Sequence, residues 1–396
     1  MRLQLTMPQS ARQPRPPASK TLDTDNGIPP RSAVLAAALA LPGVVAAETA
    51  PTEGLIAFKY LWYHDQQPGL SRITVNSPSV YTLLPVGESW SVEGTVVVDS
   101  ISGATPRYHT AISGASDMND TRAAGELKLT RYFRRAVVDV GLAYSGEHDY
   151  KSTAGSLDVR LASEDNNTTL ALGTAFTADQ IDSTGGAVTG ETRQVNDFLV
   201  GLTQVLSPYD IAKVNLTYAR GRGYFSDPYK LVDVRPRQRN ETAVLTQWNH
   251  SFASESTLRS SYRYYSDTFG VKAHTFGLEF AQGVGGAWTL TPALRYYTQS
   301  AADFYFGPVY DPVLGPPFPP GYLTNPPVYS SADQRLSAFG AVTIGMRVDK
   351  RFGAWNVDFR YDYYEQRGDW RLGGGGSTGL APFSAHFVQL GIAKSF

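Results

Sequence analysis

The 396-residue sequence contains no cysteine, which excludes disulfide bonds, thiolate metal sites and a cysteine nucleophile. It also lacks an excess of charge of either sign. The formal net charge is -1, so nothing indicates nucleic acid as a partner. Apolar residues make up 42% of the chain, too small a share for a bundle of membrane helices. After residue 50, no apolar run approaches the roughly 18 residues that a membrane-spanning helix needs.

A short apolar run near the N-terminus has the length of a signal-peptide core. Residues 33–41 are alanine, valine and leucine, with Arg31 in front of them and the small residues 45–47 behind. We therefore expect residues 1–47 to be a signal peptide and residues 48–396 to be the mature protein. The polar stretch before Arg31 is unusually long for such a signal. A start codon assigned too far upstream is the preferred explanation, and a disordered extension is the alternative.

The last segment of the chain alternates between two kinds of residue. Val388, Leu390 and Ile392 share one face of a strand, whereas the other face carries small or polar residues such as Gln389. An apolar outer face opposite a small, polar inner face is typical of a transmembrane β-barrel. The final Phe396 resembles the C-terminal signal that outer-membrane barrels of Gram-negative bacteria present to their assembly machinery. We therefore predict a bacterial outer-membrane location, with membrane lipid and the barrel assembly machinery as partners.

The same alternation recurs along the mature chain, in about sixteen segments of roughly ten residues each. One late hairpin, for example, pairs 335–350 with 355–367. Every second connection is a tight turn rich in Gly, Pro, Asn, Asp or Ser. Most of the others are long, namely 102–121, 179–192, 223–239, 300–334 and 368–384.

This pattern predicts an all-β fold, a transmembrane antiparallel up-and-down β-barrel of about sixteen strands. A soluble β-sandwich or propeller is the alternative, because both also contain short alternating strands. No repeat of fixed period supports a propeller. Pro292 lies inside a predicted strand. We expect it to lie near a rim or at a bulge, or else to remove one hydrogen bond from the ladder.

Charged residues at inward positions are the candidates for a pore lining. Two interpretations of them stay open. Opposed acidic and basic walls would create a transverse field that orients dipolar solutes. Alternatively, the charges pair across neighbouring strands and only solvate the lumen. The pore-lining candidates are Glu93, Glu126, Asp139 and Asp158 on the earlier strands, and Arg259, Arg263, Arg295, Arg347 and Arg360 on the later ones.

The connection 301–334 is rich in proline, which makes it stiff and extended with little capacity for helix. It also carries aromatic residues, among them Tyr305, Phe306, Tyr310, Phe318, Tyr322 and Tyr329, that are suited to packing or to stacking against a ligand. A loop of this length in a compact protein is usually functional. It would either fold into the barrel mouth or remain outside as a lid facing the medium.

Signatures of an enzyme are weak. The 6 histidines show no metal-binding spacing, and no Gly-x-Ser-x-Gly elbow accompanies a candidate serine nucleophile. The glycine run 373–376 precedes no predicted helix, so it does not form a phosphate-binding loop. We therefore expect no enzymatic activity, no metal and no cofactor.

Several segments resemble a bacterial family known as domain of unknown function 3570. They are 99–110 with 113–116, 130–135, 163–168 and 226–230. The resemblance extends over nearly the whole mature chain and implies an outer-membrane barrel without an established substrate. The family's genes often lie beside those of a small lipoprotein, a thioredoxin-like protein and a flavin-attaching transferase. This neighbourhood implies an envelope redox system.

Two of the predicted loops, 102–122 and 223–239, contain several of these segments and lie at the same end of the barrel. We expect them to pack on one another at the mouth, with Arg107, Asp117, Asp227 and Arg235 pairing. A structural cap is the favoured interpretation, and a ligand site is the alternative.

Taken together, the sequence predicts a channel for small hydrophilic solutes. The alternative is a closed barrel that acts as a scaffold for an envelope redox partner, either a lipoprotein or a flavoprotein. An outer-membrane hydrolase is a third and weaker hypothesis.

Overall fold

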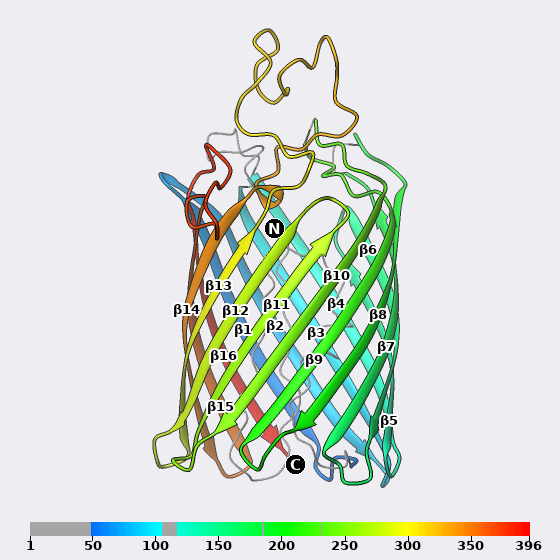
Figure 1. The fold of residues 1–396 in the computed structure, drawn as a ribbon. Coiled ribbons are helices and arrows are strands. Elements are labelled where there is room, and N and C mark those ends of the chain that lie inside the picture. Colours follow the sequence, from blue (N-terminus) through cyan, green and yellow to red (C-terminus); the bar gives the residue numbers. More distant parts are fainter. Residues whose placement is uncertain (1–48, 105–116, 184–185, 231) are drawn as a thin grey trace.

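The computed structural model describes residues 49–104, 117–183, 186–230 and 232–396. The described chain forms a closed antiparallel barrel of sixteen strands, each bonded to its neighbours in sequence (Figure 1). The predicted fold class and strand number are confirmed. The strands are β1 (Leu55–Gln67), β2 (Leu70–Val86), β3 (Trp90–Ala104), β4 (Asp117–Tyr132), β5 (Ala136–Gly146), β6 (Tyr150–Ala162), β7 (Thr168–Ile181), β8 (Glu191–Val205), β9 (Asp210–Gly223), β10 (Gln238–Ser251), β11 (Ser256–Asp267), β12 (Lys272–Gly283), β13 (Trp288–Gln299), β14 (Phe339–Phe352), β15 (Trp355–Arg367) and β16 (Phe383–Ser395).

The first and last strands close the barrel. β1 pairs with β16 in a continuous antiparallel register that runs from Leu55 opposite Ser395 to Gln66 opposite Ser384. Two backbone hydrogen bonds between Gly54 and Phe396, of 2.8 and 3.0 Å, extend this seam to the end of the chain. Closure leaves the sheet without an unpaired edge, the condition that hydrocarbon imposes on a β-sheet.

The two rims of the barrel differ. The rim where β1 begins and β16 ends, here called the short-turn rim, carries only tight turns such as 284–287 and 353–354. In the turn 284–287, Gly285 and Gly286 have φ of 77° and 53°, a backbone conformation that favours glycine. The opposite rim, here called the long-loop rim, carries the long connections, including 224–237, 300–338 and 368–382.

Each strand has one exposed and one buried face, as β8 illustrates. Phe198, Val200 and Leu202 point outward and are 51, 49 and 48% exposed, whereas Val195 and Leu199 point inward and are 0 and 5% exposed. Large apolar side chains recur at outward positions of the other strands. A closed sheet with an apolar exterior is the fold of an outer-membrane barrel. No described helix is long and apolar enough to cross a membrane.

The inner face is less uniformly polar than the sequence predicts. Near the long-loop rim it carries two apolar clusters, and parts of the long connections pack on them. Such packing requires an apolar surface inside the barrel. One cluster comprises Leu61, Tyr63, Ile73, Val75, Phe339, Ala341, Tyr364, Phe383, Ala385 and Phe387. The other comprises Phe225, Ala243, Tyr265, Phe269, Val271, Ala273, Ala302 and Leu336.

Two prolines interrupt the ladder. Pro292 keeps its place opposite Met346 in β14, but the register between β12 and β13 has no partner at positions 291 and 292. The loss of ladder bonds expected at Pro292 is therefore present. Pro78 likewise lies within β2, and the β2–β3 register is interrupted there in the same way. Both gaps follow from the missing N–H of proline.

One predicted strand boundary is wrong. The strand expected from residue 335 begins instead at Phe339, because Gln334–Leu336 forms a short 3-10 helix, η1. The Asp333 side chain caps this helix by accepting a hydrogen bond from the Arg335 backbone N–H. The turn directs the chain into the barrel mouth before β14 starts.

The orientation of the two faces predicts an asymmetric response to a new charge. Leu142 on β5 is 63% exposed on the outer face, whereas the adjacent Ala143 lies on the inner face opposite Glu126. Leu142→Arg should destabilise the barrel in lipid vesicles: its free energy of unfolding should fall by about 2–4 kcal/mol, the cost of arginine in the hydrocarbon region. Ala143→Arg is the matched control and should cost much less. Equal losses in a urea titration would contradict the assigned orientation.

Candidate functional site: the lumen and its mouth

All nine pore-lining candidates lie on strands and share the inward parity. Glu93, Glu126, Asp139 and Asp158 come from β3 to β6, and Arg259, Arg263, Arg295, Arg347 and Arg360 come from β11 to β15. Most of their outward neighbours along the strands are apolar or aromatic, as with Phe359 and Tyr361 on either side of Arg360. The alternation of the strands therefore determines which residues contact the interior.

Most of these charges form ion pairs within the wall. Glu93 lies opposite Lys128 in the β3–β4 register, with 2.8 Å between the ammonium and the carboxylate. Asp139 pairs with Arg160. On the later strands the pairs are Arg259–Glu279 at 3.5 Å, Arg347–Asp349 at 2.5 Å and Arg360–Asp362 at 2.7 Å. Of the two interpretations, pairing across and along neighbouring strands is the one that this geometry fits.

The acidic and basic residues of the inner face are still unevenly distributed around the barrel. Among inward positions of the described chain, β3 to β8 carry more acids than bases, whereas β9 to β15 carry slightly more bases than acids. Glu126 and Asp158 form no ion pair with any described residue. The acids of the first arc are Glu93, Asp99, Glu126, Asp139, Asp158, Asp179, Glu191 and Asp197, against Arg122, Lys128, Arg160 and Arg193. The bases of the second arc are Lys213, Arg239, Arg259, Arg263, Arg295, Arg347, Arg351 and Arg360, against Glu241, Asp267, Glu279, Asp349, Asp358 and Asp362.

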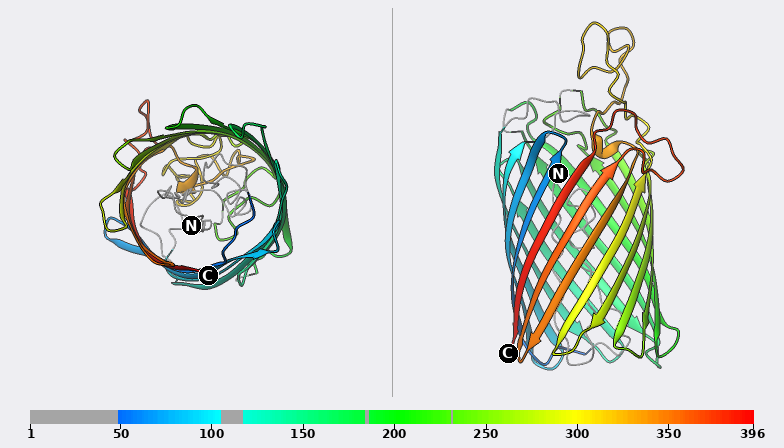
Figure 2. Two further views of the ribbon diagram at one scale, coloured as in Figure 1. Left: turned by 90° about the horizontal axis from the view of Figure 1, so that it is seen from below. Right: turned by 90° about the vertical axis from the view of Figure 1, so that its left-hand side faces the viewer.

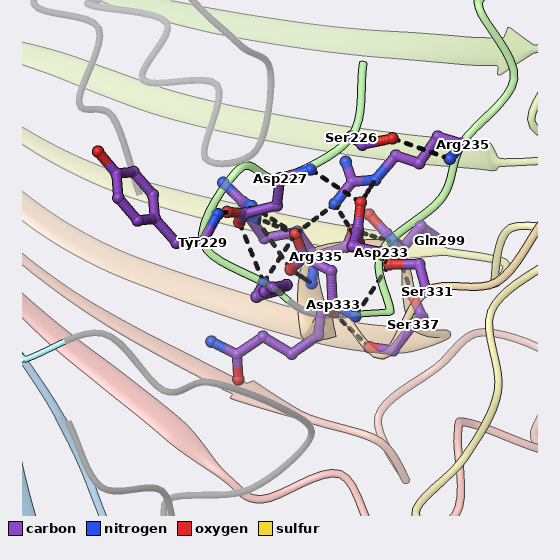
Figure 3. A network of polar contacts seen from close by, with 12 residues as sticks. Ser226, Asp227, Tyr229, Asp233, Arg235, Gln299, Ser331, Asp333, Arg335 and Ser337 are labelled. Carbon is purple, nitrogen blue, oxygen red and sulfur yellow. Dashed lines mark hydrogen bonds and ion pairs between the residues drawn. The ribbon is translucent and has the colours of Figure 1, made fainter. Parts of the chain in front are cut away.

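A dense polar network lies at the long-loop rim (Figure 3). Its centre is Asp333, whose carboxylate lies 2.8 Å from the Arg235 guanidinium and 3.1 Å from the Lys230 ammonium. Arg335 also pairs with Asp333 and reaches Asp227 at 2.9 Å. Asp333 is 1% exposed, so its charge is balanced almost entirely by these three cations.

Asp233 forms the second centre of this network. It accepts two hydrogen bonds from Arg235, of 2.7 and 2.8 Å, and one from the Asp227 backbone N–H at 2.8 Å. The Ser331 hydroxyl also donates to it. Beside it, Val234 and Ser330 form an antiparallel bridge. The connections 224–237 and 300–338 are thereby joined. We call the joined part, 226–235 (described except for residue 231) with 330–337, the mouth cap.

The mouth cap is anchored to the inner wall. The Gln334 side chain accepts a hydrogen bond of 3.2 Å from Gln67 on β1. Gln299 on β13 donates to the backbone carbonyls of Arg335 and Ser337, at 3.0 and 2.6 Å. Leu336 packs in the apolar cluster that contains Phe269. Viewed along the barrel axis, η1 lies inside the ring of strands (Figure 2).

The charges of the mouth cap shift the pKa values of its acids. Burial alone would raise the pKa of Asp227, but Lys230 and Arg335 outweigh it and lower that pKa to about 2. Burial likewise opposes ionisation of Asp333, yet Arg335, Lys230 and Arg235 hold its pKa well below the ordinary value. Burial disfavours the cation of Arg235, and Asp233 and Asp333 nevertheless raise its pKa. All three groups are therefore ionised at neutral pH.

Of the four residues predicted to pair at the mouth, two lie in one network and two cannot be compared with the prediction. Asp227 and Arg235 do lie in one network, joined through Asp233 and through Asp333 with Arg335. Arg107 lies outside the described residues, and of Asp117 the structure describes only its backbone at the start of β4. The partner loop found for Asp227 and Arg235 is 300–338, where the sequence had suggested 102–122.

The proline-rich connection combines the two arrangements that the sequence left open. Its central part projects above the long-loop rim (Figure 1), whereas its C-terminal end enters the mouth as part of the cap. The projecting part is stabilised locally. The Asp311 carboxylate accepts hydrogen bonds from the Val313 and Leu314 N–H groups, and Phe318 packs on Tyr322.

One protein family matches the chain in sequence, described as "Protein of unknown function (DUF3570)", over residues 109–193 and 187–387. The chain belongs to this family. The resemblance found in the sequence is thereby confirmed. No curated protein matches the chain.

Solved structures similar to this DUF3570 barrel include a bacterial polysaccharide outer membrane secretin, with a TM-score of 0.47, 8% identity, and coverage of 86% of this chain and 98% of that one. The siderophore receptor PirA from Pseudomonas aeruginosa matches with a TM-score of 0.43 and 8% identity, covering 86% and 80%. A Pseudomonas aeruginosa FadL homologue matches with a TM-score of 0.40 and 10% identity, covering 87% and 89%.

The DUF3570 segments recognised in the sequence occupy both rims. Segment 226–230 supplies Asp227 and Lys230 to the mouth cap. Segments 130–135 and 163–168 lie at the opposite end, where Asp165 fixes a tight turn by accepting hydrogen bonds from Asn167. Much of the segment that begins at residue 99 lies outside the described residues.

The mouth cap should open when its central acid is neutralised. Asp333→Asn leaves three cations facing one fewer carboxylate in a buried site, so the free energy that holds the cap closed should fall by about 3 kcal/mol. Amide hydrogen exchange should accelerate in 226–235 and 330–337 while the strands stay protected. Asp311→Asn, in the projecting part of the same connection, is the control and should leave the cap unchanged. Unaltered exchange in the Asp333 variant would contradict this role.

Acid should open the cap only at very low pH. Because Asp227 and Asp333 have lower pKa values in the folded cap than the ordinary 3.8, their contribution is complete above that value and is lost as the pH falls through about 2. Pepsin, which is active in this range, should cut 226–235 and 330–337 near pH 2 and spare them near pH 4. Cleavage of the cap already at pH 4 would contradict the lowered pKa values.

Proposed function

We propose that the chain is a channel for small hydrophilic solutes in the bacterial outer membrane. The observation that carries the proposal is the opposition between the two faces of each strand. Apolar side chains cover the exterior, and acidic and basic side chains line the interior from β3 to β15. Such a lining requires water or polar solutes around it. Barrels of about sixteen strands are also wide enough to hold an aqueous passage.

The outer-membrane location is part of this proposal. The apolar exterior requires lipid around the barrel, and β16 presents Leu390 and Ile392 on that exterior before the terminal Phe396. We propose that the barrel assembly machinery inserts the chain through this strand. Both ends of the described chain lie at the short-turn rim, and we propose that this rim faces the periplasm.

The proposal predicts stepwise conductance in planar lipid bilayers. Arg263 and Arg295 lie on the inner face of the arc that carries the excess of bases. Replacing both with glutamate should raise the permeability ratio of cations to anions, because the lumen then attracts cations and repels anions. Arg222→Glu, on the outer face of β9, changes the net charge without altering the lumen and should leave the reversal potential unchanged.

A second set of recordings decides whether the lumen can conduct at all. The wild type, a variant that lacks 307–328, and Asp333→Asn should be measured side by side. The deletion removes the part of the proline-rich connection that projects above the mouth, and Asp333→Asn loosens the cap within it. If inserted protein gives no conductance in any of the three forms, the channel proposal is rejected.

A closed barrel that serves as a scaffold for an envelope redox partner is the second candidate. The mouth cap favours it, because a network of six charged residues, centred on the buried Asp233 and Asp333, joins two connections inside the rim. Affinity purification from outer membranes should then recover a lipoprotein or a flavoprotein with the barrel. Recovery of the barrel alone would weigh against the scaffold.

A further inference from the structure

Three tryptophans at the short-turn rim share one arrangement. Trp90 lies directly opposite Arg131 in the register of β3 and β4, Trp288 opposite Lys350 in β13 and β14, and Trp355 opposite Lys394 in β15 and β16. In each pair the cation lies over the indole ring, with distances of 4.6, 4.4 and 5.3 Å to the ring centroid. These distances are typical of cation–π contacts.

All three pairs face outward, at the edge of the apolar band. Each residue has the parity of the exposed apolar positions of its strand, and Trp288 and Trp355 are 41 and 39% exposed. The next outward residues toward the middle of the barrel are all apolar, namely Val92, Leu129, Leu290, Val348, Val357 and Ile392. The cations therefore lie where hydrocarbon ends and lipid headgroups begin.

These outward cations differ from those inside the barrel. Arg160, Arg347 and Arg360 each pair with a carboxylate in the lumen. In the described part of the chain, Arg131, Lys350 and Lys394 make no ion pair, and their contacts at this rim are with aromatic rings. A cation held at the headgroup level without an internal counter-charge requires an external anion.

We propose that these three pairs bind the phosphates of anionic phospholipids in the leaflet at the short-turn rim. The inference rests on the proposed membrane location. The charges are complementary, and each indole ring holds its cation at the depth of the phosphate while its apolar body packs on acyl chains. Two of the pairs lie on the neighbouring hairpins β13–β14 and β15–β16, so this surface is densest beside the seam between β16 and β1.

The fourth tryptophan of this rim shows a contrasting arrangement. Trp248 donates its indole N–H to Asp210 at 3.0 Å, and the adjacent His250 also contacts that carboxylate. An anion of the protein thus occupies the position that lipid phosphate would take. We therefore assign no phosphate to this part of the rim.

The test is equilibrium binding of phosphatidylglycerol to the folded barrel in detergent, measured by native mass spectrometry, with phosphatidylcholine as the reference lipid. A triple variant carries Arg131→Gln, Lys350→Gln and Lys394→Gln. Its preference for phosphatidylglycerol should fall by about fivefold for each pair removed, since one basic residue near a membrane surface contributes about 1 kcal/mol. Arginine at 350 and 394 should preserve binding.

The matched control removes the same charges from the long-loop rim. It carries Lys151→Gln, Arg222→Gln and Lys272→Gln, which replace exposed cations that no tryptophan accompanies. The control should retain the wild-type preference. Equal loss in both triple variants, or a wild type that binds both lipids alike, would overturn the proposal.

Two further outcomes are separable. If the triple variant does not fold, as judged by its heat-dependent mobility on gels, the single variants Lys350→Gln and Lys394→Gln decide the question. A wild type that fails to insert into vesicles would reject the membrane location itself. A wild type that inserts but shows no lipid preference would reject only the phosphate sites.

Discussion

The need to satisfy every backbone N–H and C=O group within hydrocarbon governs this structure. A sheet meets that need only when its edges disappear, and here β1 and β16 remove them through a register that continues to Gly54 and Phe396. An even number of antiparallel strands then returns the chain to the rim where it started. Closure also gives each strand one face toward the exterior and one toward the interior, so the alternation of the sequence follows from it.

The interior combines two kinds of surface. Over much of its height, charges pair within the wall, as Glu93 does with Lys128 and Arg360 does with Asp362. Such pairing reduces the cost of placing charges on a confined surface. Near the long-loop rim the wall turns apolar, and Leu336 of η1 packs there. The mouth cap is therefore stabilised both by ion pairs with buried carboxylates and by packing on the apolar inner wall.

The strands could be predicted from the sequence because their signal is local. Alternation with a period of two identifies the outward face of β8 without knowledge of its neighbours, and turn residues mark the ends. The mouth cap could not be predicted in the same way, because Asp233 and Asp333 are about a hundred positions apart and no local pattern relates them. The segment Ser330–Arg335 contains an Asp and an Arg at the end of a proline-rich loop. Such a combination is too common in loops to identify a particular site.

The most direct test uses the absence of cysteine, since any introduced cysteine is then unique. Single cysteines at 197 to 202 of β8 can carry a spin label in lipid vesicles, where collision with oxygen reports hydrocarbon and collision with a water-soluble nickel complex reports water. Positions 198, 200 and 202 should contact oxygen, and positions 197, 199 and 201 should contact the nickel complex. Equal accessibility at all six positions would contradict a barrel with lipid outside and water inside.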